Sequence, residues 1–137
     1  MPRKHQVEEE DAATLKLGSE FNNAGCLMIS EVKTLLEFRA ENSGKTASET
    51  AVFKNTKAYV DTFSKFNDDT SRSVREALTR HIDLGLTQFE IAQLANLIPA
   101  TAEEAKNCIP SLILKLDDDQ LQDILNEIQA MYRSQTR

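Results

Sequence analysis

Residues 86–112 read LTQFEIAQLANLIPATAEEAKNCIPSL, and this stretch decides the fold because it encodes two helices together with their ends. Thr87 and Glu90 have the spacing of a capping box, in which each side chain accepts a hydrogen bond from a backbone N–H that the first helical turn leaves unpaired. Leu86 and Ile91 flank the box at the positions of a hydrophobic staple. The pattern therefore predicts a helix that begins immediately after the threonine.

The same kind of signal marks the next helix. Pro99 predicts the end of the first one, because proline disfavours the α conformation in the residue before it. Thr101 and Glu104 repeat the capping-box spacing, and Pro110 closes the second helix. The residues of the first helix that we expect in the core are Ala92, Leu94, Ala95, Leu97 and Ile98.

The rest of the chain is predicted to be helical too, which makes the fold class all-α with six helices. Only four glycines and three prolines occur in 137 residues, and β-branched residues nowhere alternate as they do in strands. Residues 14–17 form a short segment that could be extended, and Gly18 breaks it. The other predicted helices are residues 30–41 with Ser30 as N-cap, a helix from a Thr46–Glu49 capping box to Phe66, one from Thr70 to a stop at Gly85, and one capped by Asp117 with Gln120.

Apolar positions at helical spacing predict the buried face of each of these helices. The helix that ends at Phe66 has the expected stripe Val52, Thr56, Val60 and Phe63, and the helix that begins at Thr70 has Val74, Ala77, Leu78 and Ile82. In the last helix the stripe is Leu121, Ile124, Leu125, Ile128 and Met131, and Leu116 and Leu121 form the staple.

Composition narrows the class of protein. A chain of 137 residues fits one domain with a real core, and no apolar run approaches the ~20 residues that span a bilayer. The start of the chain, MPRKHQVEEED, lacks the apolar region of a secretory signal. Cys26 and Cys108 are too few for a disulfide framework and predict reduced thiols. The net charge of −6 argues against autonomous binding to a phosphate backbone.

No catalytic constellation is visible. The run from Asp117 to Asp119 could be a metal-binding cluster, but consecutive helical residues point in different directions, and acids at a helix N-terminus complement its dipole, so capping is the favoured interpretation. His81 and Asp83 are two residues apart and do not share a helix face. Four isolated glycines build no phosphate-binding loop. We therefore predict no enzyme activity, no cofactor and no metal.

Two surfaces are candidates for binding. Arg72, Arg75 and Arg80 lie along one predicted helix and could form a basic patch for nucleic acid, although acidic residues surround them and a solvated helix face of mixed charge is favoured. The first third of the chain holds a dense apolar set, and sequence alone leaves open whether the domain's own core or a partner covers it. This set comprises Phe21, Leu27, Met28, Ile29, Val32, Leu35, Leu36 and Phe38.

Three motifs point to a family. FEIA-x-LANL-x-P-x-TAEEAK-x-x-IPSL at residues 89–112, SEVKTLLE at residues 30–37 and FSKF at residues 63–66 resemble the stalk subunit four family of eukaryotic RNA polymerase II. The likeness covers most of the chain, from about residue 9 to residue 131. Some fungal members carry a long charged insertion after the first helix, whereas only about eight residues intervene here, so functions of that insertion are not transferred.

The resemblance implies an architecture: a compact HRDC-like helical domain at residues 46–137, preceded by a polar, acidic tail at 1–13 and a partner-binding arm, first helix and linker at 14–45. It also implies a non-catalytic subunit that pairs with the seventh polymerase subunit to form the stalk near the RNA exit path. Its work there would be initiation, nascent-RNA handling mainly through the partner, and docking of factors on the polymerase core. The implied location is the nucleus, with a cytoplasmic role left open and no membrane involved.

In this family the N-terminal segment and first helix pack against the seventh subunit. The implied partner interface is Phe21, Leu27, Ile29, Val32, Leu35 and Leu36, and Ser30, Glu31 and Glu37 also match the family pattern. Leu35 and Leu36 point about 100° apart on a helix, so only one of them faces squarely inward, and the sequence does not say which. Two alternatives stay open: the equivalent stalk subunit of RNA polymerase III, and a free-standing HRDC-like nucleic-acid-binding module.

Overall fold

The computed structural model describes residues 9–42 and 50–135, and within these ranges it contains six α-helices and no β-strand. The all-α prediction is confirmed. The α-helices are α1 (Ile29–Asn42), α3 (Ala51–Phe63), α4 (Asp68–Thr79), α5 (Gln88–Leu97), α6 (Ala102–Cys108) and α7 (Asp118–Ser134), and the short 3-10 helices are η1 (Ala12–Thr14), η2 (Ile82–Leu84) and η3 (Pro110–Leu112).

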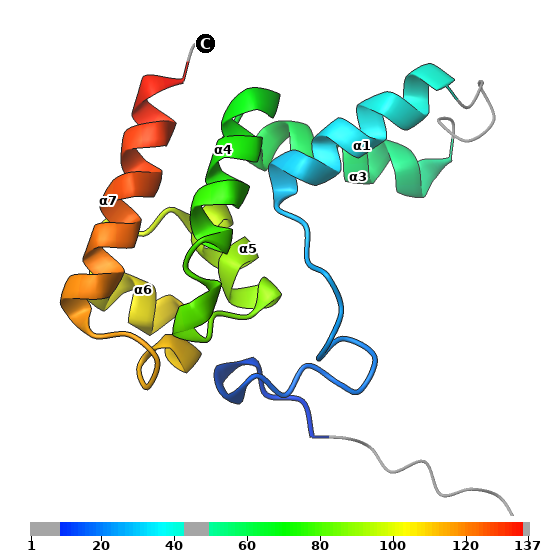
Figure 1. Ribbon diagram of the computed structural model, residues 1–137. Coiled ribbons are helices and arrows are strands. Elements are labelled where there is room, and N and C mark those ends of the chain that lie inside the picture. Colours follow the sequence, from blue (N-terminus) through cyan, green and yellow to red (C-terminus); the bar gives the residue numbers. More distant parts are fainter. Residues whose placement is uncertain (1–8, 43–49, 136–137) are drawn as a thin grey trace, which may run out of the picture.

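The helices form two groups (Figure 1). Helices α4 to α7 cluster around a common core, while α1 and α3 lie side by side and project away from the α4 side of that cluster. The segment before α1 runs back beneath the cluster, where η1 lies against η3. No helix in the described parts of the chain has the length and apolar character needed to cross a membrane.

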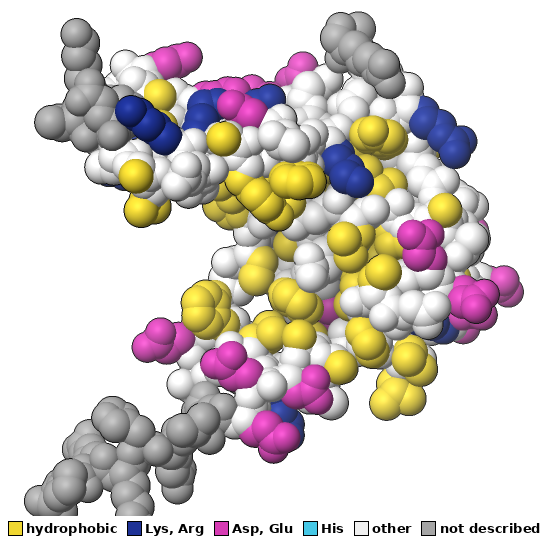
Figure 2. All heavy atoms as spheres, turned by 180° about the vertical axis from the view of Figure 1, so that it is seen from behind, with side chains coloured by type: hydrophobic (Ala, Val, Ile, Leu, Met, Phe, Trp, Pro, Cys, Tyr) yellow, Lys and Arg dark blue, Asp and Glu magenta, His cyan; other side chains and the backbone are white. Residues whose placement is uncertain are grey.

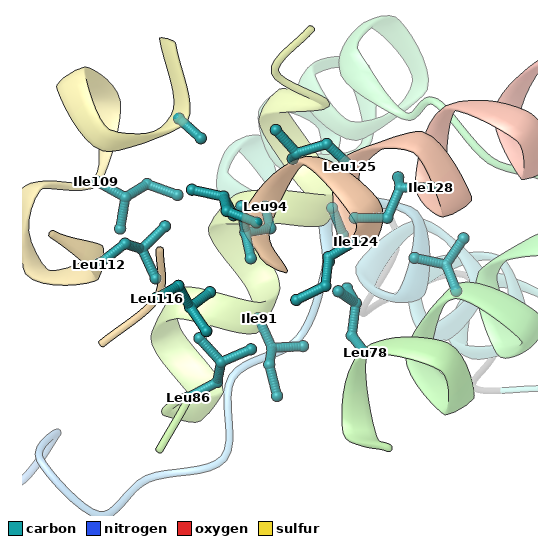
Figure 3. Close-up of a cluster of buried hydrophobic side chains, with 14 of the residues drawn as sticks. Leu78, Leu86, Ile91, Leu94, Ile109, Leu112, Leu116, Ile124, Leu125 and Ile128 are labelled. Carbon is teal, nitrogen blue, oxygen red and sulfur yellow. The ribbon is translucent and has the colours of Figure 1, made fainter. Parts of the chain in front are cut away.

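The core sits between α4, α5, α6 and α7, with Leu86, Leu112 and Leu116 closing it from the connecting segments (Figure 3). The predicted stripe of α7 is confirmed for Leu121, Ile124, Leu125 and Ile128, which are all buried, and Met131 packs at the edge. In α5 the core residues are Ala92, Leu94 and Ala95, but Leu97 is exposed and Ile98 only half-buried. Ile98 packs against the edge of the core and ends α5 in a left-handed conformation, with φ of 43°.

Two of the predicted capping boxes are confirmed. The Thr87 hydroxyl accepts the Glu90 N–H at 3.2 Å, and the Glu90 carboxylate accepts the Thr87 N–H at 2.9 Å. Asp117 and Gln120 exchange the equivalent bonds at the start of α7. Pro99 follows the left-handed residue that ends α5, so the predicted stop is in the predicted place.

The third capping box forms only half of its bonds. Thr101 accepts the Glu104 N–H at 3.1 Å, but the Glu104 carboxylate accepts the N–H of Ala100 instead, at 2.9 Å. The chain turns sharply between Pro99 and Thr101, and this turn brings the Ala100 amide within reach of the carboxylate. Pro110 opens η3 directly after α6, so its predicted role as a stop holds.

The start of α1 differs from the prediction. The helix begins at Ile29, and Ser30 lies inside its first turn rather than capping it. The Ser30 hydroxyl is buried and accepts a hydrogen bond from the Ser71 hydroxyl of α4 at 2.8 Å. The first free amides find other acceptors: the Met28 N–H donates to the Glu31 carboxylate, and the Ile29 N–H to the Asn96 side chain. A local bond from Glu31 and a distant one from Asn96 thus take the place of the predicted Ser30 cap.

The predicted extended segment at residues 14–17 is also wrong. Asp11 caps the 3-10 turn η1, and Leu15 ends it in a left-handed conformation with φ of 59°. An isolated bridge between Asp11 and Lys16 closes this small loop. Gly18, with φ of 91°, does break the segment as expected.

Helix α3 shows the largest departure. The predicted Thr46–Glu49 box lies outside the described residues, and the helix that is described begins after an N-cap at Thr50. It ends at Phe63 rather than Phe66, because Ser64 turns extended and Phe66 swings into the core, edge-on to Tyr132 at 6.0 Å between ring centroids. Of the predicted stripe only Val60 is buried, and Val52, Thr56 and Phe63 are exposed.

The end of α4 also comes early. The helix stops at Thr79, and the separate turn η2 leads to Gly85, whose φ of 86° ends that turn rather than α4. Val74, Ala77 and Leu78 are buried as predicted, while Ile82 is exposed because it lies on η2, beyond the helix whose face it was expected to extend. The turn η2 and the left-handed Gly85 redirect the chain so that α5 packs back against α4.

Candidate partner-binding surface

The segment that leads into α1 is fastened to the helical cluster by polar contacts. The Met28 side chain is fully buried in the core, and the two amides at positions 28 and 29 are bonded to Glu31 and Asn96. Arg75 of α4 donates to the Cys26 carbonyl at 2.7 Å and forms an ion pair with Glu31. The base of α1 therefore has a defined position relative to the cluster.

The structure separates the six expected interface residues into two classes. Phe21, Leu27 and Leu35 are exposed, with 64%, 49% and 54% of their surface accessible. The others are half-buried: Ile29, Val32 and Leu36. On α1 the outward residue of the adjacent pair is therefore Leu35, whereas Leu36 is the more covered of the two.

Leu27 and Leu35 meet in one hollow between α1 and α4. This hollow has a volume of about 230 Å³, and Glu31, Asp68 and Arg72 also line it. Thr34 crosses from α1 to α4 by donating to the Asp68 carboxylate at 2.6 Å. Phe21 is not part of this hollow. It lines a smaller recess with Leu15, Leu17 and Phe89, where the N-terminal segment lies against the start of α5.

Exposed apolar side chains extend over both projecting helices. Figure 2 shows, from behind, that the α1–α3 pair and the N-terminal segment enclose a broad hollow with hydrophobic side chains along its walls. Four of these residues are Phe38 of α1 and Val52, Tyr59 and Phe63 of α3. Phe38 belongs to the apolar set whose covering the sequence left open, whereas Val52 and Phe63 were expected on a buried helix face. The Tyr59 and Phe63 rings are tilted by 44° with their centroids 4.7 Å apart.

A signal for this exposure was present in the sequence. Apolar residues occur on several sides of α3, at Val52, Phe53, Tyr59, Val60 and Phe63, and one neighbouring helix covers only one side. Within the described part of α3, only Phe53, Lys57 and Val60 are covered, and Lys57 lies 3.8 Å from Glu37 of α1. The other apolar residues of the helix are exposed. Such a patch on a soluble protein is typical of an interaction surface.

The arginines of α4 do not form a free basic patch. Arg75 is half-buried and paired with Glu31, and Arg80 donates to Glu127 of α7 at 2.8 Å. Arg72 lines the hollow between α1 and α4 together with Asp68. The favoured interpretation, a helix face of mixed charge, agrees with these pairings.

The acidic run at the start of α7 serves structural contacts. Asp117 caps the helix, and Asp118 forms an ion pair with Lys106 of α6 at 2.6 Å. His81 lies 3.6 Å from the Glu127 carboxylate of α7. Across residues 9–42 and 50–135, no three His, Cys, Asp or Glu side chains gather in a way that would hold a metal ion.

A family model described as RNA polymerase Rpb4 matches residues 26–132. The chain belongs to the RNA polymerase Rpb4 family. The match begins at Cys26, whose carbonyl Arg75 binds, and extends nearly to the end of α7. It therefore includes five of the six expected interface residues, while Phe21 precedes it.

Full-length relatives of the Rpb4 family support the assignment. A DNA-directed RNA polymerase II subunit 4 from Arabidopsis thaliana is 41% identical, over 92% of this chain and 96% of that protein. The subunit rpb4 of RNA polymerase II from Schizosaccharomyces pombe is 40% identical, over 98% of this chain and 99% of that protein. The corresponding subunit from Dictyostelium discoideum is 39% identical, over 88% of each chain.

The stretch at residues 86–112 is built around a buried carboxylate. Glu90 is fully buried, and besides capping α5 it accepts hydrogen bonds from Ser111 of η3 at 2.6 Å and from Lys115. Lys115 also donates to the Gly85 carbonyl. Burial raises the pKa of the Glu90 carboxyl, but the hydrogen bonds from Lys115, Ser111 and Thr87 outweigh it and leave the pKa below its ordinary value.

Proposed function

We propose that this chain is a non-catalytic subunit of DNA-directed RNA polymerase II that pairs with the seventh subunit to form the stalk beside the RNA exit path. Membership in the Rpb4 family and relatives named as polymerase II subunits support the polymerase assignment. In the stalk the chain contributes to initiation, to handling of the nascent transcript mainly through its partner, and to docking of factors. This work takes place in the nucleus.

The observation that carries the pairing is the exposed apolar surface of the projecting helices. Leu27 and Leu35 line a hollow whose apolar walls face solvent in the isolated chain, and Phe38 and Phe63 extend the apolar surface along α1 and α3. Burying such side chains stabilises an association by roughly 25 cal/mol for each Å² removed from water. We assign Leu35 to the partner and Leu36 to the contact between α1 and α3.

Of the alternatives, the free-standing nucleic-acid-binding module has the least support. Two of the three arginines on α4 are engaged in ion pairs, and the chain carries a net charge of −6. An acidic surface repels a phosphate backbone, and single-strand binders combine a basic groove with exposed aromatic residues. The polymerase III stalk subunit is disfavoured by the names of the relatives, which are polymerase II subunits.

The pairing is tested by titrating the chain with the seventh subunit and comparing charged variants. Leu35→Glu should weaken the affinity by about tenfold or more, because the new carboxylate would be desolvated and unpaired in the interface. Leu36→Glu should instead lower the melting temperature, since the Leu36 side chain is half-buried within its own chain. Ile82→Glu, at a site with a similar 45% exposure on η2, is the matched control and should bind as the parent does.

Two results would overturn this proposal at different levels. If the parent chain does not bind the seventh subunit at all, the pairing itself is wrong. If the parent binds and Leu35→Glu binds equally well, the pairing stands but the outer face of α1 is not the interface.

A further inference from the structure

Arg75 connects three other segments of the chain. Its guanidinium donates to the Cys26 carbonyl at 2.7 Å, to both carboxylate oxygens of Glu31, and to the Gln88 side chain at 3.0 Å. These acceptors belong to the arm, to α1 and to α5, whereas Arg75 itself lies in α4. A planar guanidinium with five N–H donors can bind such a spread of acceptors, and a lysine ammonium cannot.

Two of the three residues that Arg75 binds lie at the ends of one short segment. Cys26 and Glu31 bracket residues 27–30, which include Leu27 and Ile29 of the proposed interface. The Glu31 carboxylate, held by Arg75, also accepts the Met28 N–H at 2.8 Å and thereby starts α1. The buried Met28 side chain fixes the middle of the segment in the core, which turns Leu27 toward the hollow.

We propose that Arg75 is a positioning residue for the partner-binding surface: it holds residues 26–31 in the conformation that the seventh subunit binds. This inference rests on the proposed function. Without Arg75 the half-buried Glu31 carboxylate loses its ion-pair partner, and the amide that starts α1 is held only by a loosened cap. The partner must then order this segment on binding, and the free energy of that ordering is subtracted from the affinity.

The charge of Arg75 is not available for another ligand. Each of its three nitrogens already donates a hydrogen bond within the chain, and the side chain is only about one-fifth exposed. A role in direct phosphate binding is therefore disfavoured by the geometry, and a role in holding the arm is favoured.

The test compares Arg75→Gln with Arg75→Lys and with Arg80→Gln, which removes an exposed arginine of the same helix that pairs with Glu127 instead. Each full-length chain is titrated with the seventh subunit, melted thermally, and followed by amide hydrogen exchange. We expect Arg75→Gln to bind about tenfold more weakly. We also expect faster exchange at Met28 and Ile29, with little change in α5 and α7. Arg75→Lys should bind within about threefold of Arg75→Gln, and Arg80→Gln should match the parent.

The outcomes separate the inference from the function on which it rests. If the parent binds and Arg75→Gln binds equally well at a temperature where both are folded, Arg75 does not position the surface. The proposal would also be contradicted if Arg75→Lys restored full affinity. A positive charge alone, without the several contacts of the guanidinium, would then be enough to hold the segment. If the parent fails to bind the seventh subunit, the proposed function falls and the positioning role with it. A role in stability alone would lower the melting temperature and leave the affinity of the folded chain unchanged.

Discussion

Glu90 shows what a local motif reveals about a residue and what it hides. Its spacing from Thr87 predicts the capping box, because the two residues are three apart and the bonds are local. The same carboxylate also binds Ser111 and Lys115, which lie 21 and 25 residues further along the chain. No sequence pattern indicated these bonds, since they depend on how η3 and the turn that follows it fold back over α5. The motif was therefore readable, but the burial of its charge was not.

Replacing Glu90 tests this buried network. Glu90→Gln removes the charge and leaves Lys115 without its ion-pair partner, so the free energy of unfolding should fall by about 1–3 kcal/mol near neutral pH. Because the pKa of Glu90 is lowered in the folded chain, its stabilising contribution is complete above the ordinary glutamate pKa and is lost as the pH falls through the lowered value. Urea unfolding of parent and variant from about pH 7 to about pH 3 should show the gap closing toward acid. Glu103→Gln, at an exposed site in α6, should show no such gap, and a gap that is constant with pH would contradict the assignment.

Leu94 tests the core at a single position. Its side chain is fully buried among residues of α5 and α7, so Leu94→Ala should lower the free energy of unfolding by about 2–5 kcal/mol through lost contacts and a cavity. Leu97→Ala, in the same helix but exposed, should cost well under half as much. Denaturant titrations measure both. Affinity for the seventh subunit should be unchanged below the melting transition, and a variant that lost pairing but kept its stability would move α5 into the interface.

At the scale of helices, features set by neighbouring residues in the sequence were predicted better than features set by tertiary contacts. The starts of α5 and α7 and the stop at Pro99 follow from residues within one turn of each end, and the structure confirms them. The buried face of α3 and the start of α1 depend on tertiary neighbours, and there the predictions were wrong. Apolar residues occur on several sides of α3, so the position of α1 decides which side is covered. Ser30 pairs with Ser71 although its sequence context resembles an N-cap. The expected interface residues were named from a family resemblance, and their role stays a prediction, as does the HRDC-like arrangement.

Gly85, in the turn between α4 and α5, and Gly25, in the segment before α1, give a matched pair of substitutions. Gly85 has φ of +86° and Gly25 has no such value, while the position of a Cβ is open space at both. Gly85→Ala should therefore cost about 1–2 kcal/mol from backbone strain alone. Gly25→Ala should be neutral or slightly stabilising, because it restricts only the unfolded chain. Thermal melts of the two variants measure the difference. Equal melting temperatures would mean that the turn adjusts without cost.

The whole molecule combines a closed core with an open side. Helices α4 to α7 bury their apolar faces against one another, whereas α1 and α3 keep exposed residues such as Leu35, Phe38 and Tyr59. A stable partner explains this division, and the core alone does not require it. Sequence reasoning identified the apolar set of the first helix, but it assigned the outer side of α3 to the core, because it could not show that only one helix covers α3.

The isolated chain should therefore behave poorly without its partner. We expect concentration-dependent self-association or aggregation, because large exposed apolar patches are uncommon on soluble monomers. Size-exclusion chromatography with light scattering, run on the chain alone and after mixing with the seventh subunit, measures this directly. Mixing should yield a single heterodimer peak. A monodisperse monomer over a wide concentration range, with uniform amide protection through α1, would contradict the expectation.

The projecting pair is also a lever. Both helices join the cluster at the same end, α1 through residues 26–31 and α3 through the turn into α4, and their far ends reach into solvent (Figure 1). At about 1.5 Å per residue, the 14 residues of α1 extend about 21 Å, so a tilt of about 10° at the base moves the tip by about 4 Å. Substitutions at residues 26–31, even ones that touch no partner, would thus displace the far end of α1 more than its base.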